Sequence, residues 1–413
     1  MKTRDGISRR HFLWHAALAS AVITVPRFAL AAAPRDGRLV VILLRGALDG
    51  LSAVPPHGDP DYRRLRGALA IGAPGTSQGA LPLDQTFGLH PGLGFLHEAW
   101  AARKLTVFHA VATPYRQRSH FDGQDVLENG LGRPHETGSG WLNRALATLP
   151  GAASAETGVA LGDTVPLVMR GPARVASWSP SRMPEPDDDT LQRLTDLYAD
   201  DAVLGTALAG AMAAENMADA AIADPEAGSG RQQRRGGRRE GLLPATLRAA
   251  AGFLARPDGP RVAVLDTRGW DTHAREGAGT GQLATRLGVL DNSLRQFRQA
   301  LGETWSDTAV LMVTEFGRMA AANGTGGTDH GTAAAALLVG GAVEGGHVVA
   351  DWPGLSPRNL HEGRDLAATL DLRSVFKGLL MEQLGVSPTA LERDVFPGSH
   401  DAKALRDLVR SSV

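Results

Sequence analysis

The stretch RLVVILLRGALDG, at residues 38–50, is a continuous apolar run that ends in a glycine-containing turn. Its apolar residues do not alternate with polar ones, which is typical of a strand buried on both faces of a parallel sheet. Three later stretches repeat this pattern, at residues 105–113, 261–269 and 307–317. Each ends in a polar or glycine-rich loop, so the sequence predicts at least four buried strands.

Helical patterns lie between these strands. Residues 92–104 and 282–302 carry apolar side chains at three- and four-residue spacing. Residues 371–385 open on Asp371, a plausible N-cap, and close on Gly385. Strands that alternate with helices predict the α/β class, with a doubly wound, mostly parallel sheet flanked by helices.

The N-terminus predicts an export signal. SRRHFL, at residues 8–13, is followed by the apolar segment WHAALASAVITV and by the small-residue stretch ALAAAP. Paired arginines, a short apolar segment and a cleavage site near Ala33 are typical of a twin-arginine signal, and the alternative is an amphipathic first helix. We therefore expect a signal peptide at 1–33, a bacterial periplasmic or secreted protein, the twin-arginine translocase as a partner during export, and no stable membrane span.

Composition narrows the class of function. The 413-residue chain is 43% hydrophobic and 21% charged, which is ordinary for a folded protein. Removal of the signal, which holds five basic residues and one acidic residue, shifts the formal net charge from −1 to about −5. We expect no nucleic-acid partner at that charge. The absence of cysteine excludes thiolate metal sites and thiol catalysis.

The middle of the chain differs from the rest. A polar stretch at 179–190 leads into alanine-rich helical sequence, which the basic run RQQRRGGRRE interrupts at 231–240. We expect residues 34–413 to form a single domain, with a helical insertion or cap at about 180–256. The basic run itself is interpreted as a mobile loop, for which simple solvation is the plainest explanation.

Polar side chains cluster at the predicted strand ends, where ligands bind in open α/β sheets. The residues are Arg45 and Asp49 after the first strand; Arg116, Arg118, Ser119, His120, Asp122 and Asp125 after the second; Asp271 and His273 after the third; and Glu315 and Arg318 after the fourth. The segment GGTDHG, with Asp329 and His330, follows shortly after. Four consecutive strand ends of this kind indicate a functional site.

The residue types indicate the chemistry. Carboxylates and imidazoles together suit a divalent metal such as zinc or manganese. Arginines beside them suit a tetrahedral oxyanion such as phosphate or sulfate. A Ser or Asp at the start of the helix after SHFDG is a candidate nucleophile. The sequence therefore predicts a metal-assisted site for an anionic ester.

Several motifs together resemble a known family. They are VVILLRGALDGLSAVPPHGDPDY, GLHPGL, PYRQRSHFDGQD, GWLNRAL, GWDTH, TEFGR, GGTDHG and DWPGL. The resemblance is to the domain of unknown function 1501 family, whose members are typically exported with twin-arginine signals. That family in turn resembles a distant branch of the alkaline phosphatase and sulfatase superfamily, so the resemblance implies an alkaline-phosphatase-like fold.

The resemblance also implies roles for individual residues. Asp49 resembles the metal-bound aspartate after the first strand, and Ser119 falls where the nucleophile sits. Asp271 and His273 resemble a later ligand pair, Glu315 occupies a further aspartate position, and His330 resembles the final histidine. Phe316 stands where a histidine ligand is expected. Asp329 is a candidate replacement, and one metal, two metals or none all stay open.

The leading hypothesis is an exported metal-dependent hydrolase of phosphate or sulfate esters. Its metal ligands are drawn from Asp49, Asp122, Asp271, His273, Glu315, Asp329 and His330, and its catalytic residues from Ser119, His120, Arg118 and Arg318. One alternative is a non-catalytic periplasmic protein that binds an anion, a glycan or a partner in the same cleft. Another is a purely structural surface protein. In GGTDHG, the glycines are expected to let the backbone present Asp329 and His330 to the site, and the alternative is a turn with a capping aspartate.

Overall fold

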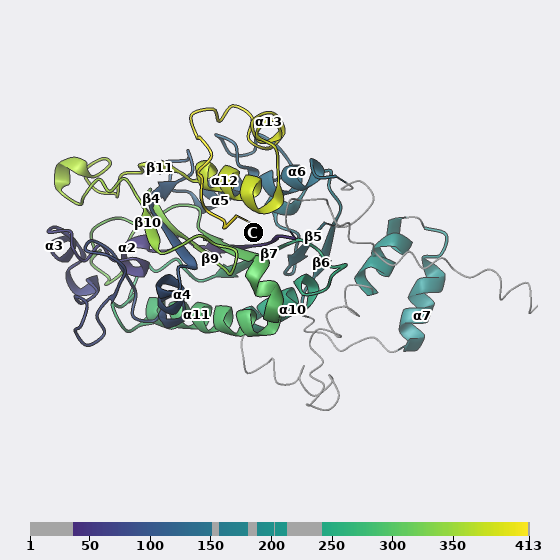
Figure 1. Ribbon diagram of the computed structural model, residues 1–413, viewed down its shortest axis with the longest axis horizontal. Coiled ribbons are helices and arrows are strands. Elements are labelled where there is room, and N and C mark those ends of the chain that lie inside the picture. Colours follow the sequence, from purple (N-terminus) through teal and green to yellow (C-terminus); the bar gives the residue numbers. More distant parts are fainter. Residues whose placement is uncertain (1–35, 151–156, 181–187, 202, 213–241, 412–413) are drawn as a thin grey trace, which may run out of the picture.

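The computed structural model describes residues 36–150, 157–180, 188–201, 203–212 and 242–411 (Figure 1). The expected signal peptide at 1–33 and the basic run at 231–240 lie outside these residues. None of the helices in the described part of the chain has the length and apolar character needed to cross a lipid bilayer.

Within the described residues, a nine-stranded sheet forms the centre of the protein, in the order β10-β4-β9-β8-β1-β7-β5-β6, with β11 also paired to β4. β1 lies between β7 and β8 and is parallel to both. β9 lies between β4 and β8 and is antiparallel to both. The strands are β1 Arg38–Arg45, β4 Leu105–Ala112, β5 Gly158–Leu161, β6 Val175–Trp178, β7 Val262–Arg268, β8 Thr308–Val313, β9 Ala334–Val339, β10 His347–Val349 and β11 Leu370–Asp371.

Helices cover both faces of this sheet (Figure 1). The apolar residues of β1 divide between two cores, since Val40, Ile42 and Leu44 belong to one and Leu39, Val41 and Leu43 to the other. The first core includes α4 (Gly94–Ala101), α10 (Leu242–Leu254) and α11 (Gln282–Leu301). The second includes α5 (His120–Asn129), α6 (Trp141–Ala147) and α12 (Leu372–Leu384). The predicted doubly wound α/β class is therefore confirmed.

α12 begins and ends at the residues that the sequence predicts. Asp371 is the N-cap, and its carboxylate accepts a hydrogen bond from the backbone N of Arg373. Gly385 ends the helix with φ of 73°, a left-handed conformation that glycine adopts without a Cβ penalty.

The predicted insertion at 180–256 is described in part. It contains α7 (Asp188–Leu197), and it ends in α10. α10 buries Leu247, Phe253 and Leu254 against the sheet and packs beside α11, so it is part of the helical layer under the sheet.

Short elements complete the fold. They are α2 Gly50–Ala53, α3 Tyr62–Arg66 and α13 Pro388–Ala390; β2 Leu81–Pro82 and β3 Gly88–Leu89, which form a separate two-stranded sheet; the 3₁₀ turns Gly67–Leu69, Leu167–Met169, Gly302–Asp307 and Pro357–Asn359; and a π turn at Leu391–Val395.

The strand directions position the candidate site. β1, β7 and β8 are parallel, so their carboxyl ends meet at one edge of the sheet. β4 runs in the same direction because β9 is antiparallel to both β4 and β8. The start of β9 lies at that same edge for the same reason. The segment GGTDHG, which precedes β9, therefore meets residues that follow β4, β7 and β8.

Candidate metal and anion site

Three side chains from distant parts of the sequence converge at this edge. His120 is the first residue of α5, Asp271 follows β7, and His330 precedes β9. One ligand atom from each lies within 4.8 Å of the others. His120 Nε2 is 3.4 Å from Asp271 Oδ2, and His330 Nε2 is 3.3 Å from Asp271 Oδ1. Two imidazoles and a carboxylate thus face a common point.

His273 and Asp329 extend this group on its exposed side. His273 Nε2 lies 3.0 Å from both Asp271 Oδ1 and His330 Nε2. His273 Nδ1 lies 3.5 Å from Asp329 Oδ1, which also accepts a hydrogen bond of 3.2 Å from Asn323. Hydrogen bonding by Asn323 and His273 lowers the pKa of Asp329. His273 is therefore adjacent to the three converging side chains, and Asp329 lies behind His273.

Glu315 orients His120. The Glu315 carboxylate is buried after β8, and its Oε1 lies 2.7 Å from His120 Nδ1. Oε1 also accepts hydrogen bonds from the backbone N of Gly46 and from Gln124. Burial alone raises the pKa of Glu315, but these hydrogen bonds outweigh it and keep the pKa below its ordinary value. With Nδ1 engaged by Glu315, the Nε2 atom of His120 is left to face Asp271.

His330 is oriented in a similar way. Its Nδ1 lies 3.0 Å from the backbone O of Arg118, so its Nε2 faces Asp271.

The pKa values of the two histidines shift in opposite directions. The hydrogen bond with Glu315 raises the pKa of His120. Burial and the neighbouring His120, in contrast, lower the pKa of His330. The neutral form that binds a metal is therefore favoured at His330.

Arg318 places a buried positive charge beside this group. Its side chain is fully buried, and Nη2 lies 2.8 Å from Asp271 Oδ1 as an ion pair. Apart from this contact with Asp271, the guanidinium nitrogens of Arg318 have no hydrogen-bond partner within the described residues. Burial opposes ionisation of Asp271, but Arg318 and the three histidines outweigh it and lower its pKa. Arg318 thus carries unused N–H donors at the edge of the site.

The glycines of GGTDHG allow the loop to pack closely against the other site loops. Gly326 has φ of 71°, which is unfavourable for residues with a Cβ. A Cβ on Gly327 would lie 2.4 Å from the backbone C of His273, and one on Gly331 would lie 2.3 Å from the backbone C of Arg318. Close backbone contact at these two glycines brings His330 to Asp271.

Asp49 lies in a separate, fully buried network. Its carboxylate pairs with Arg66 and accepts a hydrogen bond of 3.1 Å from the backbone N of Ser52. Glu276 is also buried and lies 3.5 Å from the Arg66 guanidinium. Glu276 accepts hydrogen bonds from the hydroxyls of three residues, at 3.0 Å, 2.8 Å and 3.1 Å: Ser52, Thr272 and Thr328. Asp49 is therefore already neutralised by an arginine.

If Arg66, Asp49 and Glu276 were all ionised, one positive charge would face two negative charges in this buried network. Burial and the Asp49 carboxylate raise the pKa of Glu276 to about 8, while Arg66 holds the pKa of Asp49 below its ordinary value despite burial. Glu276 thus keeps its proton to a higher pH than an ordinary glutamate does. Through Thr272 and Thr328, this network ties the loop that holds Asp271 to the loop that holds His330.

The remaining predicted residues lie around the start of α5. Ser119 is at the N-cap position of α5, and its side chain makes no capping hydrogen bond. The guanidinium of Arg118 pairs with Asp365 at 2.7 Å and with Glu362 at 2.5 Å. Asp122 accepts a hydrogen bond of 3.3 Å from Tyr115 and lies 3.4 Å from His135. The roles predicted for these residues stay predictions. Phe316 is buried and stacks on His120, with ring centroids 5.0 Å apart.

Sequence reasoning missed the Arg66–Glu276 network and the orienting role of Gln124. Arg66 ends the run YRRLR on α3, where nothing distinguishes it from a solvated arginine. Glu276 follows Asp271 by five residues in a loop, and three of its partners, Ser52, Arg66 and Thr328, come from other segments. A buried role for either residue depends on tertiary contacts that no local pattern reports.

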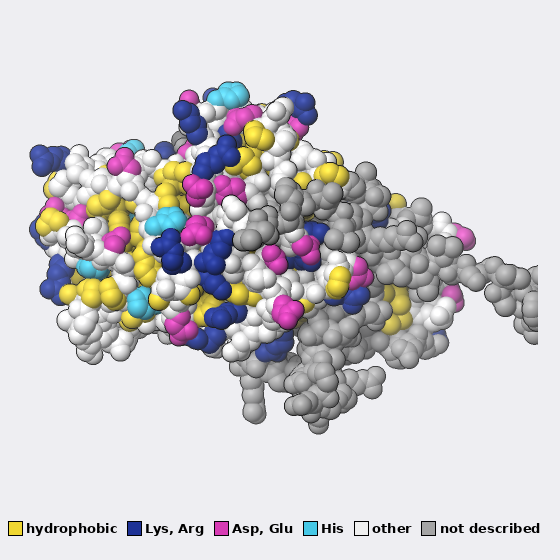
Figure 2. All heavy atoms as spheres, in the orientation of Figure 1, with side chains coloured by type: hydrophobic (Ala, Val, Ile, Leu, Met, Phe, Trp, Pro, Cys, Tyr) yellow, Lys and Arg dark blue, Asp and Glu magenta, His cyan; other side chains and the backbone are white. Residues whose placement is uncertain are grey.

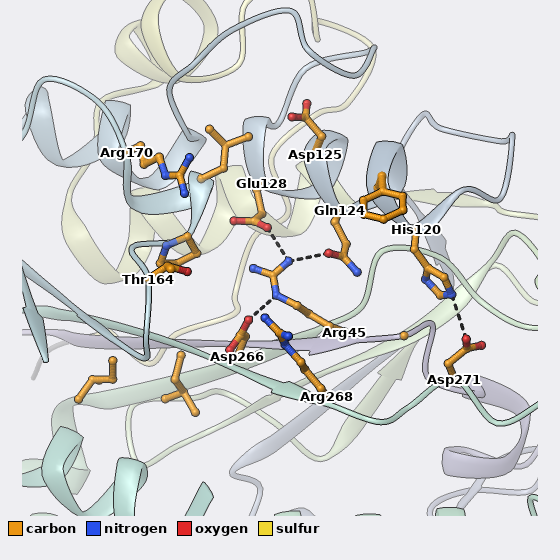
Figure 3. A pocket seen from close by; sticks show the side chains of 16 residues that line it. Arg45, His120, Gln124, Asp125, Glu128, Thr164, Arg170, Asp266, Arg268 and Asp271 are labelled. Carbon is orange, nitrogen blue, oxygen red and sulfur yellow. Dashed lines mark hydrogen bonds and ion pairs between the residues drawn. The ribbon is translucent and has the colours of Figure 1, made fainter. Parts of the chain in front are cut away.

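A cavity of about 570 Å³ opens beside the site, and His120 and Asp271 form part of its lining (Figure 3). Arg45 crosses its floor and is paired with Asp266 at 2.5 Å and Glu128 at 2.7 Å. Over the face shown in Figure 2, basic and acidic side chains are interspersed, so charge is not concentrated in one large patch of a single sign.

The fold and side chains describe an α/β protein with a polar site at the carboxyl edge of its sheet. A family model described as "Protein of unknown function (DUF1501)" matches residues 85–393, so the chain belongs to this family. The resemblance noted from its motifs is thereby confirmed. No curated protein matches the chain significantly.

Solved structures with a similar arrangement include three proteins. The phosphonate monoester hydrolase of Agrobacterium radiobacter is 10% identical, with 85% of this chain and 74% of that chain covered and a TM-score of 0.35. The lipoteichoic acid synthase LtaP from Listeria monocytogenes is 9% identical, with 88% and 76% covered and a TM-score of 0.34. A protein in the alkaline phosphatase superfamily from Vibrio parahaemolyticus is 13% identical, with 81% and 69% covered and a TM-score of 0.32. At these TM-scores the likeness carries no argument about activity, which has to come from the side chains.

Proposed function

We propose that the chain is an exported, metal-dependent hydrolase of phosphate or sulfate esters. One observation carries this proposal: the ligand atoms of His120, Asp271 and His330 lie within 4.8 Å of one another, beside the buried guanidinium of Arg318. The side chains that would hold a metal and the one that would bind an anion are thus adjacent. Export rests on the twin-arginine pattern at residues 8–13.

The donor set fits a divalent metal. Two imidazole nitrogens and a carboxylate oxygen are ligands that zinc and manganese accept. The second nitrogen of each imidazole is engaged, by Glu315 for His120 and by the Arg118 backbone for His330, which is the usual arrangement for metal-binding histidines. Within the described residues, the Nε2 atom of His120 is buried and has no hydrogen-bond partner. When bound, a divalent metal supplies Lewis acidity towards an ester oxygen.

Arg318 suits the oxyanion of the ester. Its fully buried guanidinium has N–H donors without hydrogen-bond partners in the described part of the chain. A guanidinium binds phosphate or sulfate oxygens through paired hydrogen bonds, and such bonds are stronger away from water. Arg318 would therefore orient the ester and stabilise the negative charge that develops in its transition state.

Ser119 is the candidate nucleophile. It lies directly before His120 at the N-terminus of the ten-residue helix α5, and its side chain makes no capping hydrogen bond. The N-terminus of a helix favours an anionic group, which would stabilise the alkoxide form of the serine. In the alternative, water attacks the ester directly, and Ser119 then contributes only to binding.

A non-catalytic anion-binding protein is the second candidate function. Two groups expected in a hydrolytic site are engaged elsewhere, since Asp49 pairs with Arg66 and Arg118 pairs with Asp365 and Glu362. Such a protein would keep the anion-binding guanidinium of Arg318 and show no turnover.

The test is elemental analysis of the purified mature protein together with an ester screen. We expect about one equivalent of zinc or manganese in the wild type and none in a His120→Ala, His330→Ala double variant. His400→Ala is the matched control, because His400 is exposed and pairs with Glu392 away from the site. No metal in the wild type after incubation with zinc and manganese would refute the metal site. Bound metal without turnover of p-nitrophenyl phosphate or sulfate would favour the binding protein.

A further inference from the structure

The cavity beside the site is large enough for the organic part of a substrate. Its volume of about 570 Å³ is within the usual range of small-molecule sites, roughly 300–1,000 Å³. His120 and Asp271, which belong to the converging group, also line the cavity. A group that is attached to an ester held at His120 and Asp271 can therefore extend directly into it.

The cavity lining includes apolar residues. They are Leu161, Pro166, Leu167 and Leu265, together with Phe121 in the first turn of α5. Phe121 is 87% exposed, an unusual position for a large aromatic side chain next to a polar site. Its ring offers a flat apolar surface for a ligand at the cavity.

The rest of the lining is polar and internally balanced in charge. Arg45 donates hydrogen bonds to Gln124, Glu128 and Asp266, and Figure 3 shows these contacts together with Arg268 beside them. Apart from Asp271, the charged residues of the lining are three arginines and three carboxylates: Arg45, Arg170, Arg268, Asp125, Glu128 and Asp266. This balance provides no excess charge to attract a second anionic group.

We propose that this cavity binds a neutral, polyhydroxylated group, and that the substrates are phosphate or sulfate monoesters of sugars. A sugar ring has an apolar C–H face, which packs on an aromatic ring such as that of Phe121. Its hydroxyls both donate and accept, so they match a wall of carboxylate acceptors and guanidinium donors. This inference rests on the proposed function, since it assigns the organic part of the ester hydrolysed at the adjacent site.

The test is isothermal titration calorimetry of the full mature protein, loaded with zinc, against glucose 6-sulfate, phenyl sulfate and inorganic sulfate. We expect glucose 6-sulfate to bind at least tenfold more tightly than inorganic sulfate. Phe121→Ala should weaken binding of glucose 6-sulfate about tenfold and leave the metal content unchanged. Val289→Ala is the control, because Val289 is also an exposed apolar residue but lies on α11, which packs on the other face of the sheet.

Each outcome separates the two proposals. Equal affinity for glucose 6-sulfate and inorganic sulfate, or no effect of Phe121→Ala, would overturn the assignment of the cavity. Tighter binding of phenyl sulfate than of glucose 6-sulfate would overturn the sugar and indicate an aromatic group. Metal content, measured on the same samples, reports on the proposed metal site independently, because it does not depend on how the organic group is held.

Discussion

Replacement of Glu276 by glutamine is expected to change how the stability of the protein depends on pH. Glu276 is fully buried beside Asp49 and Arg66, and its pKa is raised from 4.5 to about 8. Glutamine resembles the protonated acid in shape and hydrogen bonding but does not titrate. The Glu276→Gln variant therefore isolates the free energy that the wild type loses when this buried carboxyl has to ionise.

The direction and size follow from linkage between protonation and folding. A carboxyl whose pKa is higher in the folded than in the unfolded state contributes most stability below the unfolded pKa, and that contribution is lost as pH rises through the folded pKa. For Glu276 the loss begins near pH 4.5 and is complete above about pH 8. Each pKa unit corresponds to about 1.4 kcal/mol, so the loss reaches about 5 kcal/mol, of which about 3 kcal/mol falls between pH 6 and pH 9.

The assay is equilibrium unfolding in urea, followed by tryptophan fluorescence in the presence of a chelator at pH 6 and pH 9. The free energy of unfolding of Glu276→Gln, relative to that of the wild type, should rise by about 3 kcal/mol between these pH values. Glu276→Ala serves as the control for lost contacts, because it removes the acceptor of three hydroxyl hydrogen bonds, worth about 1 kcal/mol each, at any pH. If the free energies of unfolding of Glu276→Gln and the wild type differ by the same amount at pH 6 and pH 9, Glu276 is ionised throughout this range.

Three further results are expected. Gly317→Ala should lower the free energy of unfolding in urea by about 2–3 kcal/mol, because its Cβ would lie 1.7 Å from the backbone O of Ala333. Gly324→Ala is the control and should have little effect, because the space around Gly324 is open. Arg318→Lys should raise the inhibition constant of inorganic phosphate or sulfate about tenfold, since lysine keeps the charge but lacks the paired donors; an unchanged constant would remove Arg318 from the anion site. Zinc at 100 times its dissociation constant should stabilise the protein by about 2.7 kcal/mol in thermal unfolding, and a His330→Ala variant that still shows this shift would place the metal elsewhere.

The sequence predicted the parts of the fold that depend on local pattern. The four predicted strands correspond to β1, β4, β7 and β8, each within a few residues, because runs of branched apolar residues have few other places to be buried. Asp371 and Gly385 bound α12 through capping contacts that span only a few residues. The gathering of polar residues at one edge followed from the parallel strand direction alone.

Other features depend on contacts between distant segments. Two pairs of carboxylates lie in similar loops: Asp49 with Glu276, and Asp271 with Glu315. Arg66 contacts the first pair, and His120 contacts the second. Nothing in the local sequence distinguishes the two pairs. His120 itself was predicted as a catalytic residue, and only the hydrogen bond with Glu315 shows that its Nε2 atom faces Asp271 and His330.

The place of β9 has a consequence for how the chain folds during synthesis. β4 is complete at Ala112, but its strand partners β9, β10 and β11 begin only at Ala334, His347 and Leu370. Both hydrogen-bonding edges of β4, and one edge of β8, therefore stay unpaired until the last fifth of the chain has left the ribosome. Unpaired edges of apolar strands are prone to pair with other chains, and contacts of such long range form slowly. Shortened chains that stop before residue 334 are therefore expected to aggregate, and the complete sheet can form only after synthesis is almost finished.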